Sequence, residues 1–209
     1  MARFPSYPGL VIESDENVWA GRTRLDVVKF RHPRFNGSLS PTRTWEVWHR
    51  GDAVGLLPYD PLTDQVVMIE QFRLPALAAR VDPVMLEIPG GFMDEGEDAE
   101  QTAAREVQEE MGLATDRTEL FGRFILTAGG SDESATIYAG RVRAPATGPD
   151  GIAGYAGLAS ENEDIRIRVL PAATVIAGVQ AGAYPNSITT MALLWFALKR
   201  DWLRERWAA

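Results

Sequence analysis

Residues 98–111 constrain the fold most, because their pattern predicts a helix and marks both of its ends. Asp98 followed by Gln101 matches a capping box, which satisfies the free amides of a first helical turn. Gly112 stands where a helix commonly stops. The apolar residues recur at helical spacing, at Ala103, Ala104, Val107 and Met111. We therefore expect one side of this helix to pack on a core.

The polar side of the same helix carries Glu106, Glu109 and Glu110. Offsets of three and four residues place these side chains on one face. Like charges at this spacing repel each other, so the arrangement costs stability unless a cation joins them. Carboxylate oxygens are suitable ligands for Mg²⁺ or Mn²⁺. The alternative is a solvated helix face without a function.

Residues 1–50 predict a small antiparallel sheet. Residues 23–30 read as an extended segment, and a polar turn follows at residues 36–41. Residues 43–49 then alternate with period two, with Trp45, Val47 and His49 on one face. The region has too few apolar residues for its own core, so we expect it to pack on the rest of the chain or on a second subunit.

The remainder of the chain mixes strands with helices. Strands are expected in a hairpin at 53–73, and then at 83–89, 119–127, 134–142 and 164–170. Helices are expected at 171–181 and 187–207, and residues 148–163 read as a long loop. In the last helix, the spacing predicts core-facing side chains at Met191, Leu194, Trp195, Leu198 and Trp202.

Composition excludes several classes of function. The chain of 209 residues has no cysteine, which removes disulfides, thiolate metal sites and cysteine nucleophiles. A net charge of −8 disfavours general nucleic-acid binding, and an anionic substrate would need a bridging divalent cation. Two histidines cannot form a three-histidine zinc site. The longest apolar run, residues 191–198, is too short to span a membrane, and no signal peptide is visible, so we expect a cytoplasmic protein.

The segment from Gly91 through Glu97 to residues 105–113 resembles the Nudix box, a signature of hydrolases acting on nucleoside diphosphates linked to another group. The resemblance implies an α+β fold: an α/β/α sandwich with a mixed sheet at residues 51–209, after the small antiparallel sheet of residues 1–50. It also implies that the carbonyl group of Gly90 binds metal, Mg²⁺ or Mn²⁺, beside the helix carboxylates. Arg105 can pair with neighbouring acids and fix them, and Glu97 reads as a structural partner.

The resemblance extends over nearly the whole chain to the bacterial ADP-ribose pyrophosphatase branch. The matching segments are residues 35–37, 50–51, 56–61, 69–73, 129–133 and 161–166. This implies hydrolysis of ADP-ribose to AMP and ribose 5-phosphate, by a homodimer with exchanged N-terminal sheets. Residues 127–130 read Thr-Ala-Gly-Gly where the branch has Ser-Pro-Gly-Gly, which leaves another nucleoside diphosphate sugar, such as GDP-mannose, as an alternative. A non-catalytic sensor of such ligands is a third.

Hydrolysis needs a base that activates water, and two loop glutamates are candidates. The resemblance favours Glu161 as this base and Glu163 as an additional metal ligand, with Glu133 as the alternative base. Arg73 matches a residue that contacts phosphate. For each of these side chains, a solvated turn or a surface ion pair is the alternative.

The nucleobase site is expected in the N-terminal region. By alignment with the family, Arg22 and Trp45 stand where an aromatic residue and an arginine enclose adenine, so the two types are exchanged here. Either a guanidinium or an indole can cover one face of a purine. Glu46 would accept from the adenine amino group, and Arg50 is a further substrate-binding candidate. The alternative is that Trp45 packs in a core or a dimer contact.

Overall fold

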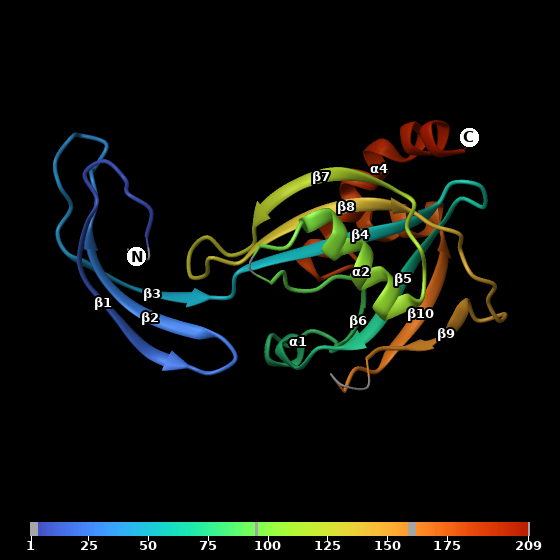
Figure 1. The fold of residues 1–209 in the computed structure, drawn as a ribbon, viewed down its shortest axis with the longest axis horizontal. Helices are drawn as coiled ribbons and strands as arrows, with labels where there is room; N and C mark the ends of the chain where they lie inside the picture. Colours follow the sequence, from blue (N-terminus) through green and yellow to red (C-terminus); the bar gives the residue numbers. More distant parts are fainter. Residues whose placement is uncertain (1–3, 95, 159–161, 209) are drawn as a thin grey trace. The chain divides into compact units, whose positions relative to one another are not determined.

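The computed structural model describes residues 4–94, 96–158 and 162–208. The chain forms two compact units (Figure 1). The first contains the residues up to Gly51 together with Ile125–Glu133, and the second contains Asp52–Phe124 and the chain from Ser134 onward. The first unit is therefore built from two separate pieces of sequence. That residues 1–50 serve as a dimerisation domain, and residues 51–209 as a catalytic one, stays a prediction.

The first unit is a three-stranded antiparallel sheet, as expected. Its strands, in the order β1-β2-β3, are β1 Val11–Ala20, β2 Arg24–Arg31 and β3 Arg43–His49. Among the described residues of this unit, Val28 is the only apolar side chain that is fully buried. The expectation that this region lacks a core of its own is therefore confirmed.

The second unit contains a mixed sheet of seven strands. The strand order is β7-β8-β4-β5-β10-β9, with β6 paired to β5, and β4 runs parallel to β8. The strands are β4 Asp52–Asp60, β5 Gln65–Phe72, β6 Val84–Glu87, β7 Arg117–Ile125, β8 Ser134–Arg141, β9 Ile152–Ala156 and β10 Ile165–Pro171. The expected hairpin is the antiparallel pair of β4 and β5, in which Tyr59 lies opposite Val66.

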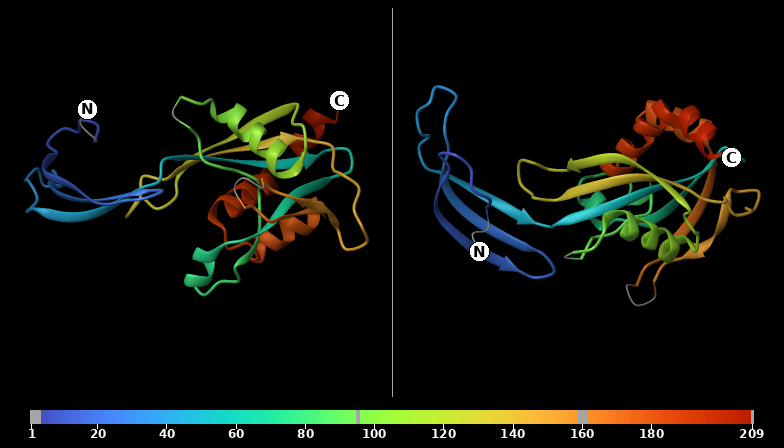
Figure 2. Two further views of the ribbon diagram at one scale, coloured as in Figure 1. Left: turned by 60° about the horizontal axis from the view of Figure 1, so that its bottom comes forward. Right: turned by 45° about the horizontal axis from the view of Figure 1, so that its top comes forward.

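Four described helices accompany this sheet: α1 Leu74–Ala78, α2 Ala99–Met111, α3 Ala172–Gln180 and α4 Ser187–Trp207. Helices α2 and α4 both pack against β4 and β8, from opposite faces of the sheet (Figure 2). The predicted α/β/α layers are thus present. Between α2 and the sheet, the core includes Val107 and Ala103 of the helix with Leu56 and Ile69 of the strands. No helix among the described residues is long and apolar enough to cross a membrane.

The expected core face of α4 was wrong at three positions. Leu194, Leu198 and Trp202 are 46%, 84% and 39% exposed. The helix instead turns another stripe inward, at Thr189, Ala192, Leu193, Phe196, Leu203 and Trp207. Both stripes have helical spacing, so the pattern alone did not decide between them. Packing decides, because the Phe196 ring meets the Tyr59 ring edge-on at 4.9 Å.

Two elements were missed. Helix α1 is short and follows Arg73 directly. Strand β9 lies inside the segment expected to be a long loop, because its backbone pairs with β10, with Ala156 opposite Ile165. Gly154, at φ 154°, borders the irregularity of this strand, because Gly154 and Ile152 pair with consecutive residues of β10. Pairing with a neighbouring strand therefore overrode a glycine-rich composition that favours loops.

Candidate active site

Helix α2 has the ends that the sequence predicted. The Asp98 side chain accepts hydrogen bonds from the backbone amides of Glu100, at 3.1 Å, and Gln101, at 3.0 Å. Gly112 ends the helix with φ 67°, a left-handed conformation that favours glycine. Val107 is fully buried on the side of the helix that packs against the sheet. The orientation of the helix, and hence of its glutamates, is therefore fixed by packing.

Glu110 is a buried carboxyl group, with 4% of the residue exposed. Its Oε2 accepts a hydrogen bond from the backbone amide of Gly90 at 3.2 Å. The pKa of Glu110 is raised to about 8, first by burial and then by the negative charges of Glu106 and Glu163, while the Gly90 amide and Arg73 lower it by less. The structure thus keeps three carboxyl groups near each other at a cost in electrostatic free energy.

The turn at Gly90 and Gly91 needs glycine because other groups approach its backbone closely. A Cβ atom on Gly91 would lie 2.5 Å from the Glu106 carboxyl carbon, and one on Gly90 would meet the backbone oxygen of Val54. Strand β4 holds this turn, since the Val54 amide donates to the Gly91 carbonyl oxygen at 2.9 Å. The glycines therefore allow the chain to pass between β4 and the carboxylates of α2.

Arg105 binds the acids around it, as expected. Its guanidinium nitrogens lie 2.9 Å from Glu106, 2.6 Å from Glu109 and 3.9 Å from Glu97. Glu97 also accepts a hydrogen bond from the Asp94 amide at 2.9 Å, which agrees with a structural role. Arg105 therefore fixes two of the three helix glutamates. Its assignment as a catalytic residue stays a prediction.

Arg73 follows strand β5, and its Nε lies 2.8 Å from Glu87 Oε2. Glu87 is buried and is also bound by the Asn186 side chain at 2.6 Å. The Arg73 side chain is 43% exposed, so part of its guanidinium faces solvent. A buried carboxylate thus anchors one edge of an accessible cation. The expected phosphate contact is compatible with this arrangement and stays a prediction.

In the first unit, Trp45 and Glu46 line an open cavity of about 670 Å³ together with Trp19 and Trp48. The Trp45 indole donates to the Gly129 carbonyl oxygen at 2.8 Å and stacks on Phe30, with 5.8 Å between ring centroids. An indole and a carboxylate therefore border the same space. Both are within the set that the sequence assigned to the nucleobase.

Arg22 does not face Trp45 within one chain. It lies in the turn between β1 and β2, whereas Trp45 pairs with Val28, six residues further along. Strands rise about 3.3 Å per residue, so the two side chains are too far apart to enclose one base. The expected sandwich is therefore not formed within a single chain, and whether Arg22 and Trp45 enclose a base in a dimer stays a prediction.

Of the two base candidates, Glu133 is engaged. Its carboxylate lies 2.9 Å from Arg50 Nε, and the Arg50 guanidinium lies over the Trp48 ring, 4.5 Å from its centre. Arg50 is thus placed between a carboxylate and an indole. Glu161 lies outside the described residues.

The chain resembles known proteins in sequence. Residues 49–175 match the NUDIX domain. The chain belongs to the Nudix family. It is 38% identical over 193 residues, or 92% of this chain and 90% of the relative, to a protein of Escherichia coli K12 named ADP-ribose pyrophosphatase. A Haemophilus influenzae protein of the same name is 29% identical and covers 97% of this chain and 92% of its own length.

A solved structure described as an ADP compounds hydrolase shares the fold of this Nudix protein. The TM-score is 0.70 at 18% sequence identity, and the match covers 99% of this chain and all of the other. This likeness supports the α+β architecture with its mixed sheet. It carries no information about substrate, because the sequence identity is low.

Nudix hydrolases generally use divalent metal ions. Among the described residues, no three acidic or histidine side chains are already gathered closely enough to hold a metal ion. The donor chemistry nevertheless fits, because Glu106, Glu110 and Glu163 are oxygen donors whose mutual repulsion a cation would relieve. The Glu163 carboxylate now accepts from the Leu158 amide at 3.2 Å. Binding therefore requires these side chains to move together.

Sequence reasoning missed His49 and Asp132, which form a contact between β3 and the Ile125–Glu133 segment. His49 Nδ1 lies 2.6 Å from Asp132 Oδ2. Asp132 stands in the Gly-Gly-Ser-Asp-Glu segment that carried the resemblance, and His49 was noted only for its strand face. The signal that the sequence offered for Asp132 was its place as an acidic residue directly beside Glu133. A partner 83 residues away gives no local signal.

Proposed function

We propose that this Nudix chain hydrolyses the diphosphate of ADP-ribose or a related ADP-sugar to AMP and a sugar phosphate, with Mg²⁺ or Mn²⁺ as cofactor. The observation that carries the proposal is the buried carboxyl group of Glu110, held by Gly90 within an intact box and beside other carboxylates. The substrate class is supported by relatives named ADP-ribose pyrophosphatase that align over nearly the full chain.

In this proposal, the metal ligands are the carboxylates of Glu106, Glu109, Glu110 and Glu163 with the carbonyl group of Gly90. A bound divalent cation would neutralise charge on the diphosphate and favour ionisation of water. Arg105 holds Glu106 and Glu109 in orientation.

The protein groups then divide the remaining tasks. Glu161 takes a proton from the attacking water. Water adds to one phosphorus, and the bridging oxygen leaves with the other phosphate. Arg73 contributes a positive charge to the phosphates. Glu133 is the weaker candidate for the base, because Arg50 already engages its carboxylate.

The nucleobase would enter the cavity lined by Trp45 and Glu46. Trp45 covers one face of adenine, and the Glu46 carboxylate accepts from its exocyclic amino group. Guanine presents an oxygen at the same position, which Glu46 would repel. Arg50 contributes a cation beside the Trp48 ring. Because Arg22 does not reach Trp45 in one chain, any second layer from Arg22 must come from another subunit.

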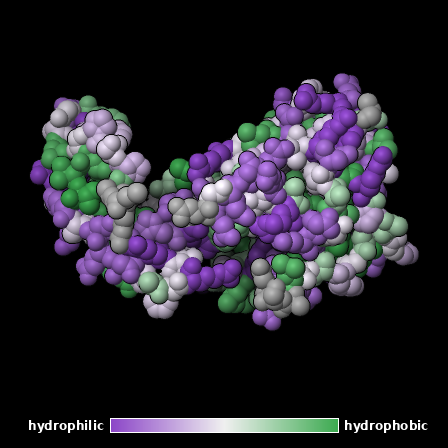
Figure 3. Space-filling model, in the orientation of Figure 1, coloured by the Kyte–Doolittle hydropathy of each residue, from purple (hydrophilic) through white to green (hydrophobic). Residues whose placement is uncertain are grey.

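We further propose that the protein is a homodimer, formed through the first unit and located in the cytoplasm. Apolar side chains lie on the surface of this unit, some visible at the left of Figure 3. Trp19 is 64% exposed, and the exposed residues there also include Tyr7, Val11, Val18, Phe35 and Trp48. A unit with one fully buried apolar side chain and this much apolar surface favours burial against a partner.

The test is a panel of nucleotide sugars with Mg²⁺ or Mn²⁺, in which released nucleoside monophosphate is measured by chromatography. We expect ADP-ribose to be hydrolysed with the highest kcat/KM, and Glu110→Gln to lose at least about a thousandfold in kcat. Faster hydrolysis of GDP-mannose would reassign the substrate, and tight ADP-ribose binding without turnover would indicate a sensor.

A further inference from the structure

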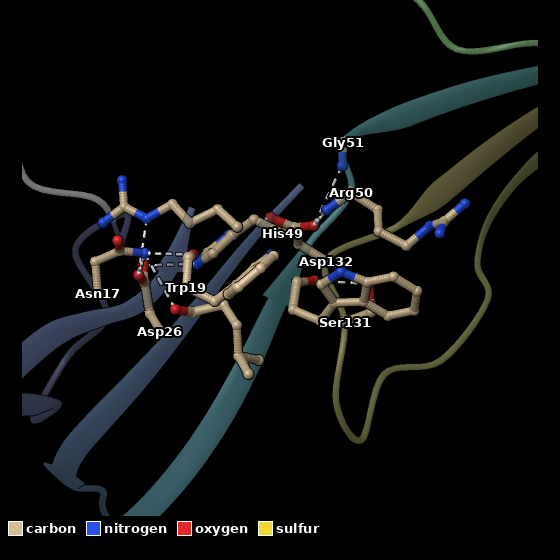
Figure 4. A network of polar contacts seen from close by, with 11 residues as sticks. Asn17, Trp19, Asp26, His49, Arg50, Gly51, Ser131 and Asp132 are labelled. Carbon is tan, nitrogen blue, oxygen red and sulfur yellow. Dashed lines mark hydrogen bonds and ion pairs between the residues drawn. The ribbon is translucent and has the colours of Figure 1, made fainter. Parts of the chain in front are cut away.

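We propose that His49 is a positioning residue that fastens the Ile125–Glu133 segment to strand β3 and thereby holds Arg50 in place. The residues involved all belong to the first unit (Figure 4). The kinetic part of the test rests on the proposed function, in which Arg50 binds substrate. The structural part does not.

The imidazole of His49 lies between two carboxylates from different parts of the sequence. Nδ1 lies 2.6 Å from Asp132 Oδ2, and Nε2 lies 3.1 Å from Asp26 Oδ2 as a charge contact without hydrogen-bond alignment. Asp26 is fully buried in β2 and is held by the Asn17 amide at 2.9 Å and by Arg24 Nε at 2.7 Å. The Asp26 carboxylate is thus fixed in the sheet, and the Asp132 carboxylate belongs to the Ile125–Glu133 segment.

Asp132 joins this contact to the backbone next to Arg50. Its Oδ1 accepts from the amide of Arg50 at 2.8 Å and from that of Gly51 at 3.3 Å. Burial would raise the pKa of Asp132, but the hydrogen bonds from the Arg50 amide, His49 and the Gly51 amide and the charge of His49 together outweigh it, so the pKa is lowered. Asp132 is therefore an ionised acceptor that binds the end of β3 and His49 together.

The neighbouring residues of the segment reinforce the attachment. Ser131 Oγ donates to the Trp48 carbonyl oxygen at 2.8 Å, and the Trp48 amide donates to the Gly130 carbonyl oxygen at 2.8 Å. The next residue, Glu133, meets Arg50 Nε at 2.9 Å, while Trp48 lies beneath the guanidinium. If the segment detaches, the Arg50 guanidinium loses the Glu133 carboxylate, and the Arg50 amide loses the Asp132 carboxylate that accepts its hydrogen bond.

The surroundings of His49 are mostly charged. The charged groups facing it are Asp26 and Arg24 from β2 and Asp132 from the segment, whereas β1 contributes the uncharged Asn17. A donor on Nδ1 of the ring serves Asp132, and removing the ring takes this donor away from the carboxylate that also holds the Arg50 amide.

The test compares wild type with His49→Ala, His49→Gln and Asp132→Asn, and uses His32→Gln as the matched control. His32 is the only other histidine in the sequence, and its ring hydrogen-bonds the neighbouring Pro33 carbonyl oxygen and lies beside the Phe30 ring, away from Asp132. Amide hydrogen exchange at Trp48 reports the attachment directly. We expect His49→Ala to accelerate it about tenfold or more, as loss of a charge-assisted hydrogen bond predicts. Glutamine, which retains one donor, should restore part of the protection.

For kinetics, we expect His49→Ala to raise KM for ADP-ribose several-fold while kcat changes little. His49→Gln should bring KM part of the way back, and His32→Gln should leave KM and Trp48 exchange close to the wild-type values. Unchanged Trp48 exchange in both His49 variants, or equal acceleration in His49→Ala and His32→Gln, would overturn the proposal. Absence of ADP-ribose turnover would count against the proposed function alone, since exchange still decides the role of His49.

Discussion

Replacing Glu110 by glutamine should have opposite effects on stability and on activity. The variant removes a charge from a buried position and keeps the oxygen that accepts from the Gly90 amide. In the folded protein the pKa of Glu110 is raised from 4.5 to about 8. A group whose pKa is raised on folding favours the folded state while it is protonated, and this contribution is lost as pH rises from about 4.5 to about 8.

The magnitude follows from the pKa change. Each pH unit corresponds to 1.36 kcal/mol, so ionised Glu110 destabilises the metal-free protein by about 3–5 kcal/mol above about pH 8. Glutamine imitates the protonated form. We therefore expect Glu110→Gln to match wild type near pH 4.5 and to become progressively more stable up to about pH 8.5, in the presence of a chelator. Turnover should nevertheless be lost, because a metal ligand is removed.

The assay is urea unfolding at several pH values with EDTA, repeated with excess Mg²⁺. Added metal should stabilise wild type and leave Glu110→Gln almost unchanged, because ligands that bind only the folded state raise its stability. For the measurements in EDTA, Glu109→Gln is the matched control, since this side chain is 32% exposed and paired with Arg105. Equal stability of wild type and Glu110→Gln at about pH 8.5 in EDTA would refute the reasoning.

Three further outcomes are expected. Glu161→Gln should lower kcat by about a hundredfold or more with little change in KM, and a larger loss in Glu133→Gln would exchange their roles. Trp45→Ala should raise KM for ADP-ribose about tenfold, from 1–3 kcal/mol of stacking, and an unchanged KM in a correctly folded variant would remove Trp45 from the nucleobase site. Gly91→Ala should reduce kcat strongly by displacing Glu106, whose carboxyl carbon a Cβ atom would approach to 2.5 Å; retained activity would contradict the close approach.

Local signals were sufficient for the parts of the fold that depend on neighbouring residues. The cap at Asp98 and the stop at Gly112 defined α2, and with it the common face of the helix glutamates. Local signals do not show which of two apolar stripes with the same helical spacing faces the core. Leu194 and Leu198 were therefore assigned to the core, although packing on the sheet turned Phe196 inward.

The features that the sequence did not reveal depend on partners distant in sequence. The distance between Arg22 and Trp45 follows from strand register, which alignment to a family does not reveal. The contact of His49 with Asp132 joins a strand to a segment 83 residues away. The burial that raises the pKa of Glu110 likewise arises only when α2 is packed. Sequence thus identified the reactive residues, and the tertiary structure determined their environments.

The Ile125–Glu133 segment limits how this protein can be divided or recombined. Because it belongs to the first unit while its flanking strands belong to the second, no single cut in the chain releases the first unit whole. A fragment ending at Gly51 lacks the acceptor for the Trp48 amide and the carboxylate bound to His49. A chimera that takes its N-terminal sheet from a relative therefore needs residues 125–133 from the same donor. Exchange between relatives should succeed for the two pieces together and fail for either piece alone.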